Sequence, residues 1–587
     1  MLIHGNILWI AIYFLTIIIK ESESSFLGES KDKTKISEIS DVIRTTTSSG
    51  VYDKWSNEYN KRRIVHNGLC KNVFPDIVVV PKSTEDVSKI IKIARHYGLP
   101  ISVRSGGHSY TCTNIKQRGI HIDLRSLNEV TLTTRRPEFQ PPGPALTLGP
   151  GSTWDRVLKR IPTTQYTMIH GQCLTVGVGG YILGGGVNAV GTSQKYGSGA
   201  MNALEYTMVD AEGNIIKASE NNVTMLNANT NRYQQVEDSV GLYRSLQLAG
   251  SSFGVVTEIH YRIFDGPELL PTIALVYIDD RTDLWKFQKA GLDGRYQLSL
   301  HVSYWFTPLN WLARERRSVT FLRLLIKFLP LLRFRKARPV ILAIVDNFPK
   351  KYQNRTNKED AYKFLEELGI KLAVKGKLSE MFQPAAFAYQ NYESTYMTTE
   401  QRIRNGPRPI VTSNFMNLTN IKSIDHVLMD HPLFGFQNYG SRRSARLGCE
   451  YCLLAIVASN MDVFTKLPSF SEFRFTPFRE IQPNDVGNFQ LELSCLYKPN
   501  VQSKCPQIVR NAKRLFTRSA ARSGEKLTQY YNTPSCDSKD RNFQNRYWSD
   551  KNNQILLKAK HFWDSKNVFN HCHSVGSTVE NCCPPDA

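Results

Sequence analysis

The 587-residue sequence predicts an α+β fold with two lobes. Two observations support the first lobe. A strand-like run, a helix-like segment and a second strand-like run follow one another between residues 76 and 105, and short strands and turns then continue to about residue 264. The second lobe is indicated by a change after residue 268, where strands and helices mix with more aromatic residues. The length also exceeds that of one domain, which is usually about 100 to 200 residues.

The first segment has a strand, helix, strand pattern. "DIVVVP" (76–81) is an apolar strand, and Ser83 then stands three residues before Asp86, as in a helix N-cap. Apolar residues recur at helical spacing from Val87 to Ala94, and Gly98 ends the helix. "ISVRSG" is the next strand, and a helical connection predicts that the two strands run parallel.

Further elements follow in the same style. We expect strands in 119–132 and 144–149, a helix from about Thr153, a strand–turn–strand unit in 202–219, and a helix around 555–563. The predicted organisation is a leader (1–25), a first domain (67–267), a second domain (268–525) and a C-terminal segment (526–576) that returns to the first.

The N-terminus and the cysteines indicate secretion. The apolar run from Ile7 to Ile19 has 13 residues, fewer than the roughly 20 of a spanning helix, and a polar stretch begins at Lys20. We therefore expect a signal peptide and an extracellular glycoprotein with disulfide bonds; the alternative is a retained membrane anchor. Three N-glycosylation sequons begin at Asn222, Asn354 and Asn417. The 11 cysteines are an odd number, so at least one is not in an intramolecular disulfide.

The net charge of +22 is dispersed except for one cluster between Arg314 and Pro339. This cluster is interpreted as the solvated face of a surface helix, with an amphipathic membrane-surface segment as the alternative. Neither a zinc-finger nor an RNA-recognition signature accompanies the charge, so we expect no nucleic-acid partner. We also predict no metal site and leave the oligomeric state open.

Two glycine-framed loops carry nucleophilic side chains. "VRSGGHSY" contains His108. Cys173 lies in the region from Gly171 to Gly199, which contains ten glycines. Glycine density of this kind indicates positive φ or close approach to a partner, here a planar or phosphate-bearing ligand. The dinucleotide fingerprint fails because Ile182 occupies the place of its third glycine. The SGGH loop beside Arg104 is either a phosphate-binding nest or a plain tight turn.

These two stretches, "VRSGGHSY" and "QCLTVGVGGYILGGG", resemble the berberine bridge enzyme-like flavoproteins. The resemblance spans about residues 67–265 and, more weakly, 547–576. It implies a PCMH-type FAD-binding domain and a substrate domain whose antiparallel sheet is covered by helices. It also implies FAD bonded covalently to His108 through the 8α-methyl group and to Cys173 through C6, which would account for the odd cysteine.

The resemblance implies further flavin contacts. They are Arg104, Ser105, Gly106, Gly107, Ser109, Tyr110, Val176, Gly177, Gly179, Gly180, Tyr181, Val256 and Asn570. Valine at position 176 goes with oxidases in this family, whereas leucine goes with dehydrogenases. The chain departs from the family pattern at Tyr181, Met201, Thr533 and His573, where histidine, aspartate, tyrosine and glutamine are usual.

A base for the substrate proton is expected in "NFQLELSCLYK". There the resemblance indicates Glu492, with Gln490 on the same strand face; the alternative is that both simply face solvent. Tyr530 and Tyr531 are further catalytic candidates.

The expected function is a secreted FAD oxidase that takes hydride from an alcohol, amine or sugar carbon and gives H2O2 from O2. Alternatives are a dehydrogenase with another acceptor, a binding protein with structural flavin, and a basic surface-binding protein.

Overall fold

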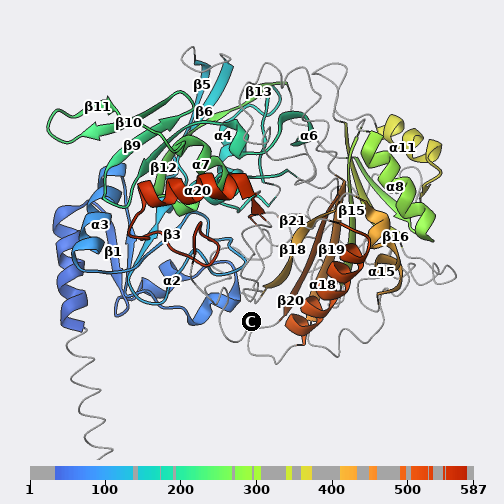
Figure 1. Cartoon of the computed structure of the whole chain (residues 1–587), viewed down its shortest axis with the longest axis horizontal. Coiled ribbons are helices and arrows are strands. Elements are labelled where there is room, and N and C mark those ends of the chain that lie inside the picture. The colour runs from blue at the N-terminus through green and yellow to red at the C-terminus, as the bar shows by residue number, and fades with distance from the viewer. Residues whose placement is uncertain are drawn as a thin grey trace, which may run out of the picture.

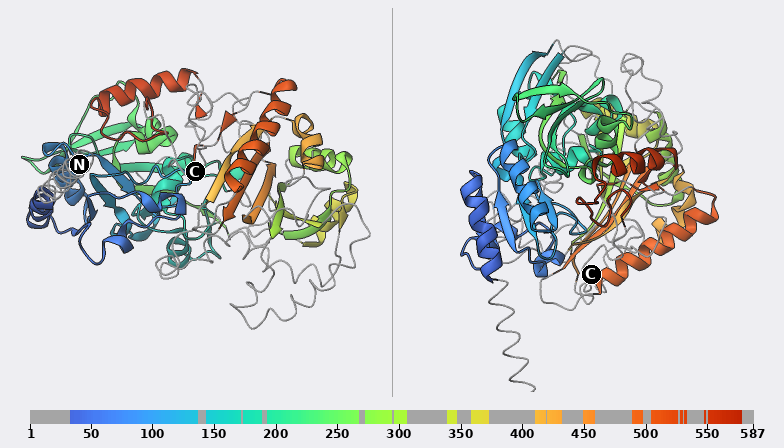
Figure 2. Two further views of the ribbon diagram at one scale, coloured as in Figure 1. Left: turned by 90° about the horizontal axis from the view of Figure 1, so that it is seen from below. Right: turned by 60° about the vertical axis from the view of Figure 1, so that its left-hand side comes forward.

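A computed structural model describes most of the chain. The described residues are 33–136, 143–171, 173–188, 193–266, 272–293, 296–305, 339–346, 358–372, 410–418, 420–431, 449–458, 489–497, 504–525, 528–529, 531–532, 547–548 and 550–577. The predicted leader, the cluster 314–338, Asn354, Tyr530 and Thr533 lie outside them. Figures 1 and 2 show the described elements as two neighbouring lobes. In the described part of the chain, no helix has both the length and the apolar character needed to cross a membrane.

The predicted strand–helix–strand unit forms the edge of the first lobe. Strands β1 (Gly50–Asp53), β2 (Ile77–Val80), β4 (Ile120–Asp123) and β3 (Ile101–Arg104) make a four-stranded sheet in that order. Helix α3 (Thr84–His96) is capped by the Ser83 side chain, which accepts a hydrogen bond from the Asp86 amide. The parallel arrangement is confirmed, but β4 lies between β2 and β3 and is parallel to both.

A seven-stranded antiparallel sheet forms the rest of this lobe. Its order is β11 (Arg232–Gln235), β10 (Asn222–Asn227), β9 (Ile215–Ser219), β8 (Ala203–Val209), β12 (Val255–Arg262), β6 (Gly143–Leu148) and β5 (Val130–Arg136). The expected strand–turn–strand unit is β8 and β9, which pair antiparallel. Trp154 of α4 (Trp154–Arg160) and Leu246 of α7 (Leu242–Ala249) share one buried core with Tyr206 and Tyr261 of the sheet.

The second lobe is an eight-stranded antiparallel sheet with helices over it. The order is β17 (Lys371–Leu372), β14 (Thr272–Tyr277), β16 (Pro339–Asp346), β15 (Tyr296–Trp305), β19 (Cys449–Ala458), β20 (Phe489–Tyr497), β18 (Ile410–Leu418) and β21 (Thr528–Gln529). Helices α8 (Arg281–Asp293), α11 (Lys358–Glu367), α15 (Asp425–Asp430) and α18 (Cys505–Arg522) contribute buried residues to the same core as these strands. The predicted α+β class, with a helix-covered antiparallel sheet, is confirmed.

The chain end returns to the first lobe. Helix α20 (Asp550–Trp563) packs beside α7 and is the red helix of Figure 1. Lys560 is buried there, and its ammonium group donates to the Ser252 carbonyl at 2.7 Å and to the Asp564 carboxylate at 2.7 Å. The Trp548 indole donates to the Leu248 carbonyl at 3.2 Å. These bonds fix the C-terminal segment against α7 and the turn that follows it.

Candidate active site

The loop that carries His108 follows β3 directly. Gly107 has φ +83°, a left-handed conformation that glycine adopts without strain, and its carbonyl accepts from the His66 amide at 2.9 Å. The imidazole of His108 stacks on that of the buried His66, with 4.0 Å between ring centroids and 16° between ring planes. The loop thus presents His108 in a fixed orientation. The Ser105 hydroxyl donates to the Pro150 carbonyl at 2.5 Å and fastens the loop from the other side.

The loop that carries Cys173 is held by the start of α4. The amides of Trp154 and Asp155 donate to the carbonyls of Val176 and Leu174 at 3.3 and 2.9 Å, and the Val176 amide donates to the Cys173 carbonyl at 3.0 Å. Cys173 carries a reduced thiol. Five other cysteines of the described chain are disulfide-bonded, namely Cys70, Cys112, Cys495, Cys505 and Cys572. The Cys173 thiol is therefore available for other chemistry.

The two loops touch through glycines. A Cβ atom added to Gly106 would lie 2.4 Å from the Gly177 nitrogen, and one added to Gly177 would lie 2.1 Å from the Gly106 nitrogen. Real Cβ atoms do not approach other atoms this closely, so both positions require glycine. Each of these two glycines accommodates the other loop, and the predicted contact of both with a ligand stays a prediction.

Thr175 joins the two nucleophiles. Its hydroxyl oxygen lies 3.0 Å from Nε2 of His108 and 3.8 Å from Sγ of Cys173. Thr175 was not among the residues predicted from the sequence, although "QCLT" has a hydroxyl residue two positions after Cys173. The structure therefore brings His108 and Cys173, which are far apart in sequence, close to one hydroxyl group.

Arg104, which was predicted to lie beside a pyrophosphate, is buried, and its guanidinium group forms hydrogen bonds with the backbone. Its Nη1 donates to the carbonyls of Arg62 and Ile64, each at 2.8 Å, at the end of α2 (Tyr59–Arg63). Ser109 shares a hydrogen bond of 2.8 Å with Thr113, and the Tyr110 carbonyl accepts from the Asn67 amide group. Their predicted contacts with a cofactor stay predictions.

The helix α5 (Val178–Leu183) follows the Cys173 loop. Gly179 lies against Pro150, whereas Gly180 is exposed with open space around it. Tyr181 is buried and meets the Trp154 ring edge-on at 5.1 Å. Val256 lies buried in β12 opposite Met208. Helix α5 and strand β12 thus place Tyr181 and Val256, two further predicted flavin contacts, in one hydrophobic core.

The C-terminal segment brings polar groups together that the sequence analysis did not connect. The Ser251 hydroxyl lies 3.2 Å from the Tyr531 hydroxyl and 3.1 Å from Nε2 of His571. Burial raises the pKa of Tyr531, so its phenol keeps its proton near neutral pH. Tyr531 is therefore suited to donating a hydrogen bond rather than to acting as a base. Nearby, the Asn570 amide oxygen accepts from Ser574 and Ser577 at 3.4 and 3.3 Å.

Gln490 and Glu492 lie on one face of β20. Leu491 and Leu493, on the opposite face, are fully buried in the core beneath the helices. Gln490 is only 3% exposed, so the alternative that it simply faces solvent is wrong, and Glu492 is half-buried. A buried glutamine beside a half-buried carboxylate is an arrangement that can orient a polar substrate.

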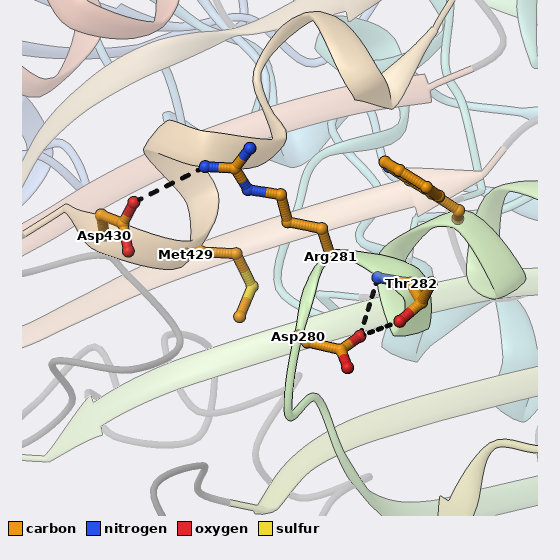
Figure 3. A pocket seen from close by; sticks show the side chains of 6 residues that line it. Asp280, Arg281, Thr282, Met429 and Asp430 are labelled. Atoms are coloured by element: carbon orange, nitrogen blue, oxygen red, sulfur yellow. Dashed lines mark hydrogen bonds and ion pairs between the residues drawn. The ribbon is translucent and has the colours of Figure 1, made fainter.

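A separate pocket lies on the second lobe (Figure 3). It has a volume of about 410 Å³ and is lined by Asp280, Arg281, Thr282, Trp285, Met429 and Asp430. Arg281 approaches the Asp430 carboxylate at 4.0 Å across it. None of the predicted site residues lines this pocket, which is formed by α8 and α15.

Two family models match the chain. A model described as "FAD binding domain" covers residues 75–219, and a model described as "Berberine and berberine like" covers residues 529–576. The first match contains both His108 and Cys173, and the second contains Tyr531 and His571. The chain has the two-part organisation of berberine bridge enzyme-like FAD-linked oxidoreductases. The resemblance stated from the sequence is confirmed.

Curated relatives match about a third of this chain. The FAD-dependent monooxygenase tpcD of Cochliobolus heterostrophus is 32% identical over 196 residues, which is 33% of each chain. The (R)-6-hydroxynicotine oxidase of Paenarthrobacter nicotinovorans is 26% identical over 228 residues, 39% of this chain and 44% of the oxidase. The match to the first of these relatives therefore spans about a third of its length.

Solved structures match the berberine bridge enzyme-like fold over nearly the whole chain. A chitooligosaccharide oxidase superposes with TM-score 0.64 at 17% identity, covering 92% of this chain and 100% of the oxidase. Berberine bridge enzyme itself superposes with TM-score 0.61 at 18% identity, covering 93% and 99%. At these identities the likeness shows the fold, including the second lobe that the family models do not cover.

The residues present fit FAD. A reduced thiol and an imidazole converge on one hydroxyl, and two glycines let their loops approach closely enough for that convergence. When bound, the flavin would supply a two-electron acceptor for substrate oxidation. His108 and Cys173 are the residues that would hold it.

Proposed function

We propose that the protein is a secreted oxidase whose FAD is bonded to both His108 and Cys173. The observation that carries the proposal is the approach of His108 Nε2 and Cys173 Sγ to one hydroxyl oxygen, that of Thr175, at 3.0 and 3.8 Å. Thiolates and imidazoles form covalent bonds with electrophilic carbons, and two such groups at one point suit two bonds to one ring. A flavin fixed in this way cannot dissociate between turnovers.

The proposed reaction is oxidation of an alcohol, amine or sugar carbon. Glu492 takes the substrate proton, Gln490 orients the substrate, and Tyr531 donates a hydrogen bond from its protonated hydroxyl. The oxidase relatives are named for a hydroxynicotine and for a chitooligosaccharide, so both amine and sugar substrates belong in the search.

Replacement of Glu492 by glutamine is expected to lower kcat by about 100-fold, within the range for loss of a general base. The measurement is anaerobic flavin bleaching with a substrate found in a panel of alcohols, sugars and amines. Glu367→Gln, on an exposed position of α11, is the matched control and should bleach at the normal rate. Equal rates for the two variants would remove Glu492 from the mechanism.

Oxygen reactivity tests the oxidase assignment. The photoreduced protein is expected to reoxidise within seconds in air, with H2O2 formed in equal amount. The Val176→Leu variant should reoxidise at least about tenfold more slowly, which corresponds to ~1.4 kcal/mol in the barrier. Stopped-flow absorbance follows both proteins. Reoxidation of the wild-type protein over many minutes would instead indicate a dehydrogenase with another acceptor.

Secretion and glycosylation rest on the leader and the sequons. The Cys70–Cys112 disulfide supports an oxidising compartment, and Asn222 lies exposed at the start of β10. Protein from the culture medium is expected to lose mass on enzymatic deglycosylation, and Asn222→Gln should remove one glycan. Protein found only inside the cells, with unchanged mass after the treatment, would contradict secretion.

A further inference from the structure

Three side chains form a continuous row in the candidate site. The Cys173 thiol, the Thr175 hydroxyl and the His108 imidazole are joined by contacts of 3.8 and 3.0 Å. A hydroxyl group can accept one hydrogen bond while donating another, so Thr175 can accept from the thiol and donate to Nε2 of His108. The row therefore has a direction that runs from sulfur to imidazole.

We propose that Thr175 relays the proton of the Cys173 thiol to His108 and so makes Cys173 a thiolate. The thiol proton moves to the Thr175 oxygen as the proton of Thr175 moves to Nε2 of His108. The products are a thiolate and an imidazolium, and no group is oxidised or reduced. The purpose of the relay is to activate Cys173 for bonding to the flavin, and this purpose rests on the proposed function. The proton transfer itself does not depend on it.

The relay addresses a chemical requirement of attachment. The thiolate is the nucleophilic form of cysteine, and an ordinary cysteine with pKa near 8.5 is mostly protonated at neutral pH. A base that takes the thiol proton through a hydroxyl group makes thiolate available at neutral pH. The base paired directly with other cysteine nucleophiles has the same effect. Thr175 is thus a positioning residue, and His108 has a second role besides its own attachment.

The surroundings keep the row in place. His66 stacks on His108 and sets the plane of its ring, while the Arg104 guanidinium lies against Gly107. Asp155 contacts the Cys173 loop through its amide, but its carboxylate pairs with Lys159 at 2.7 Å.

Peptide mapping of the full-length protein tests the relay. Wild-type protein, Thr175→Val and Thr175→Ser are alkylated, digested, and analysed by mass spectrometry for flavin on the Cys173 and His108 peptides. Valine keeps the shape of threonine without the hydroxyl, and serine keeps the hydroxyl. In Thr175→Val we expect the fraction of Cys173 that carries flavin to be at least tenfold lower, while the His108 peptide still carries flavin. In Thr175→Ser we expect both fractions to be near those of the wild-type protein.

A second readout does not depend on flavin attachment. The alkylation rate of Cys173 that carries no flavin is measured from pH 5 to pH 9 in the same proteins by timed quenching. In wild-type protein and Thr175→Ser the rate should stay high below pH 7. In Thr175→Val it should fall toward that of an ordinary thiol, which reacts mainly near pH 8.5.

The outcomes separate the relay from the attachment itself. If wild-type Cys173 carries no flavin, the covalent assignment fails, and the alkylation profile alone decides the relay. If Thr175→Val matches wild-type protein in both flavin fraction and alkylation profile, the relay is overturned while the attachment stands. Loss of flavin from the His108 peptide together with an unchanged alkylation profile would also overturn it, since Thr175 would then be structural.

Discussion

Acid-precipitated protein with both His108→Ala and Cys173→Ala is expected to be colourless, whereas each single variant should keep yellow flavin in its pellet. The reason is geometric, because both nucleophilic atoms contact the same Thr175 hydroxyl and so face one ring. Either bond alone resists acid denaturation. The fraction of flavin in the pellet is read from its absorbance after the protein is redissolved in denaturant.

The control for this experiment is His96→Ala, an exposed histidine in the last turn of α3, which should retain both bonds. A double variant with a yellow pellet would place the attachment at other residues. A colourless wild-type pellet would end the covalent assignment and leave FAD as a dissociable cofactor.

Alanine at Gly106 or Gly177 is expected to destabilise the protein by about 3 kcal/mol, the upper end of the usual cost of overpacking. The added methyl group at either position would collide with backbone of the other loop, at 2.4 Å and 2.1 Å from a nitrogen atom. Backbone cannot rotate away as a side chain can, so the two loops must separate. We expect separation to weaken flavin attachment at Cys173 as well, because it moves the thiol away from His108.

Gly180→Ala is the matched control, three residues further along the chain. Its Cβ would meet nothing within 4 Å, and the residue is exposed in α5, so alanine should be neutral or stabilise the helix by up to about 1 kcal/mol. Thermal unfolding and peptide mapping measure both effects. A Gly177→Ala protein as stable as Gly180→Ala would contradict the close contact of the loops.

The local parts of the fold were predictable from the sequence. Helix α3 has its capping serine and its apolar spacing within a few residues, and the β8–β9 unit contains its own turn, so each pattern specifies its structure locally. The position of β4 between β2 and β3 was not predictable in this way. It depends on which strand edges meet after residues distant in sequence have packed together.

In the candidate site, too, local features were predictable from the sequence, whereas contacts between distant segments were not. Glycine density correctly indicated close approach, but the sequence does not specify the partner, and Gly106 and Gly177 approach each other. Thr175 and Ser251 are ordinary hydroxyl residues whose significance appears only when His108 and His571 arrive from other segments. Tyr531 was a candidate base by position, yet burial raises its pKa and favours a donor role.

The return of the C-terminal segment has a consequence for biosynthesis. Lys560 and Trp548 donate to the Ser252 and Leu248 carbonyls of the first lobe, and β21 pairs with β18 in the second, so each meets a partner that is synthesised before it. The contacts at the end of α7 can therefore form only after residues 548–563 have been synthesised. An isolated 67–267 fragment would lack these contacts, so it is an unsuitable substitute for the full chain in expression work.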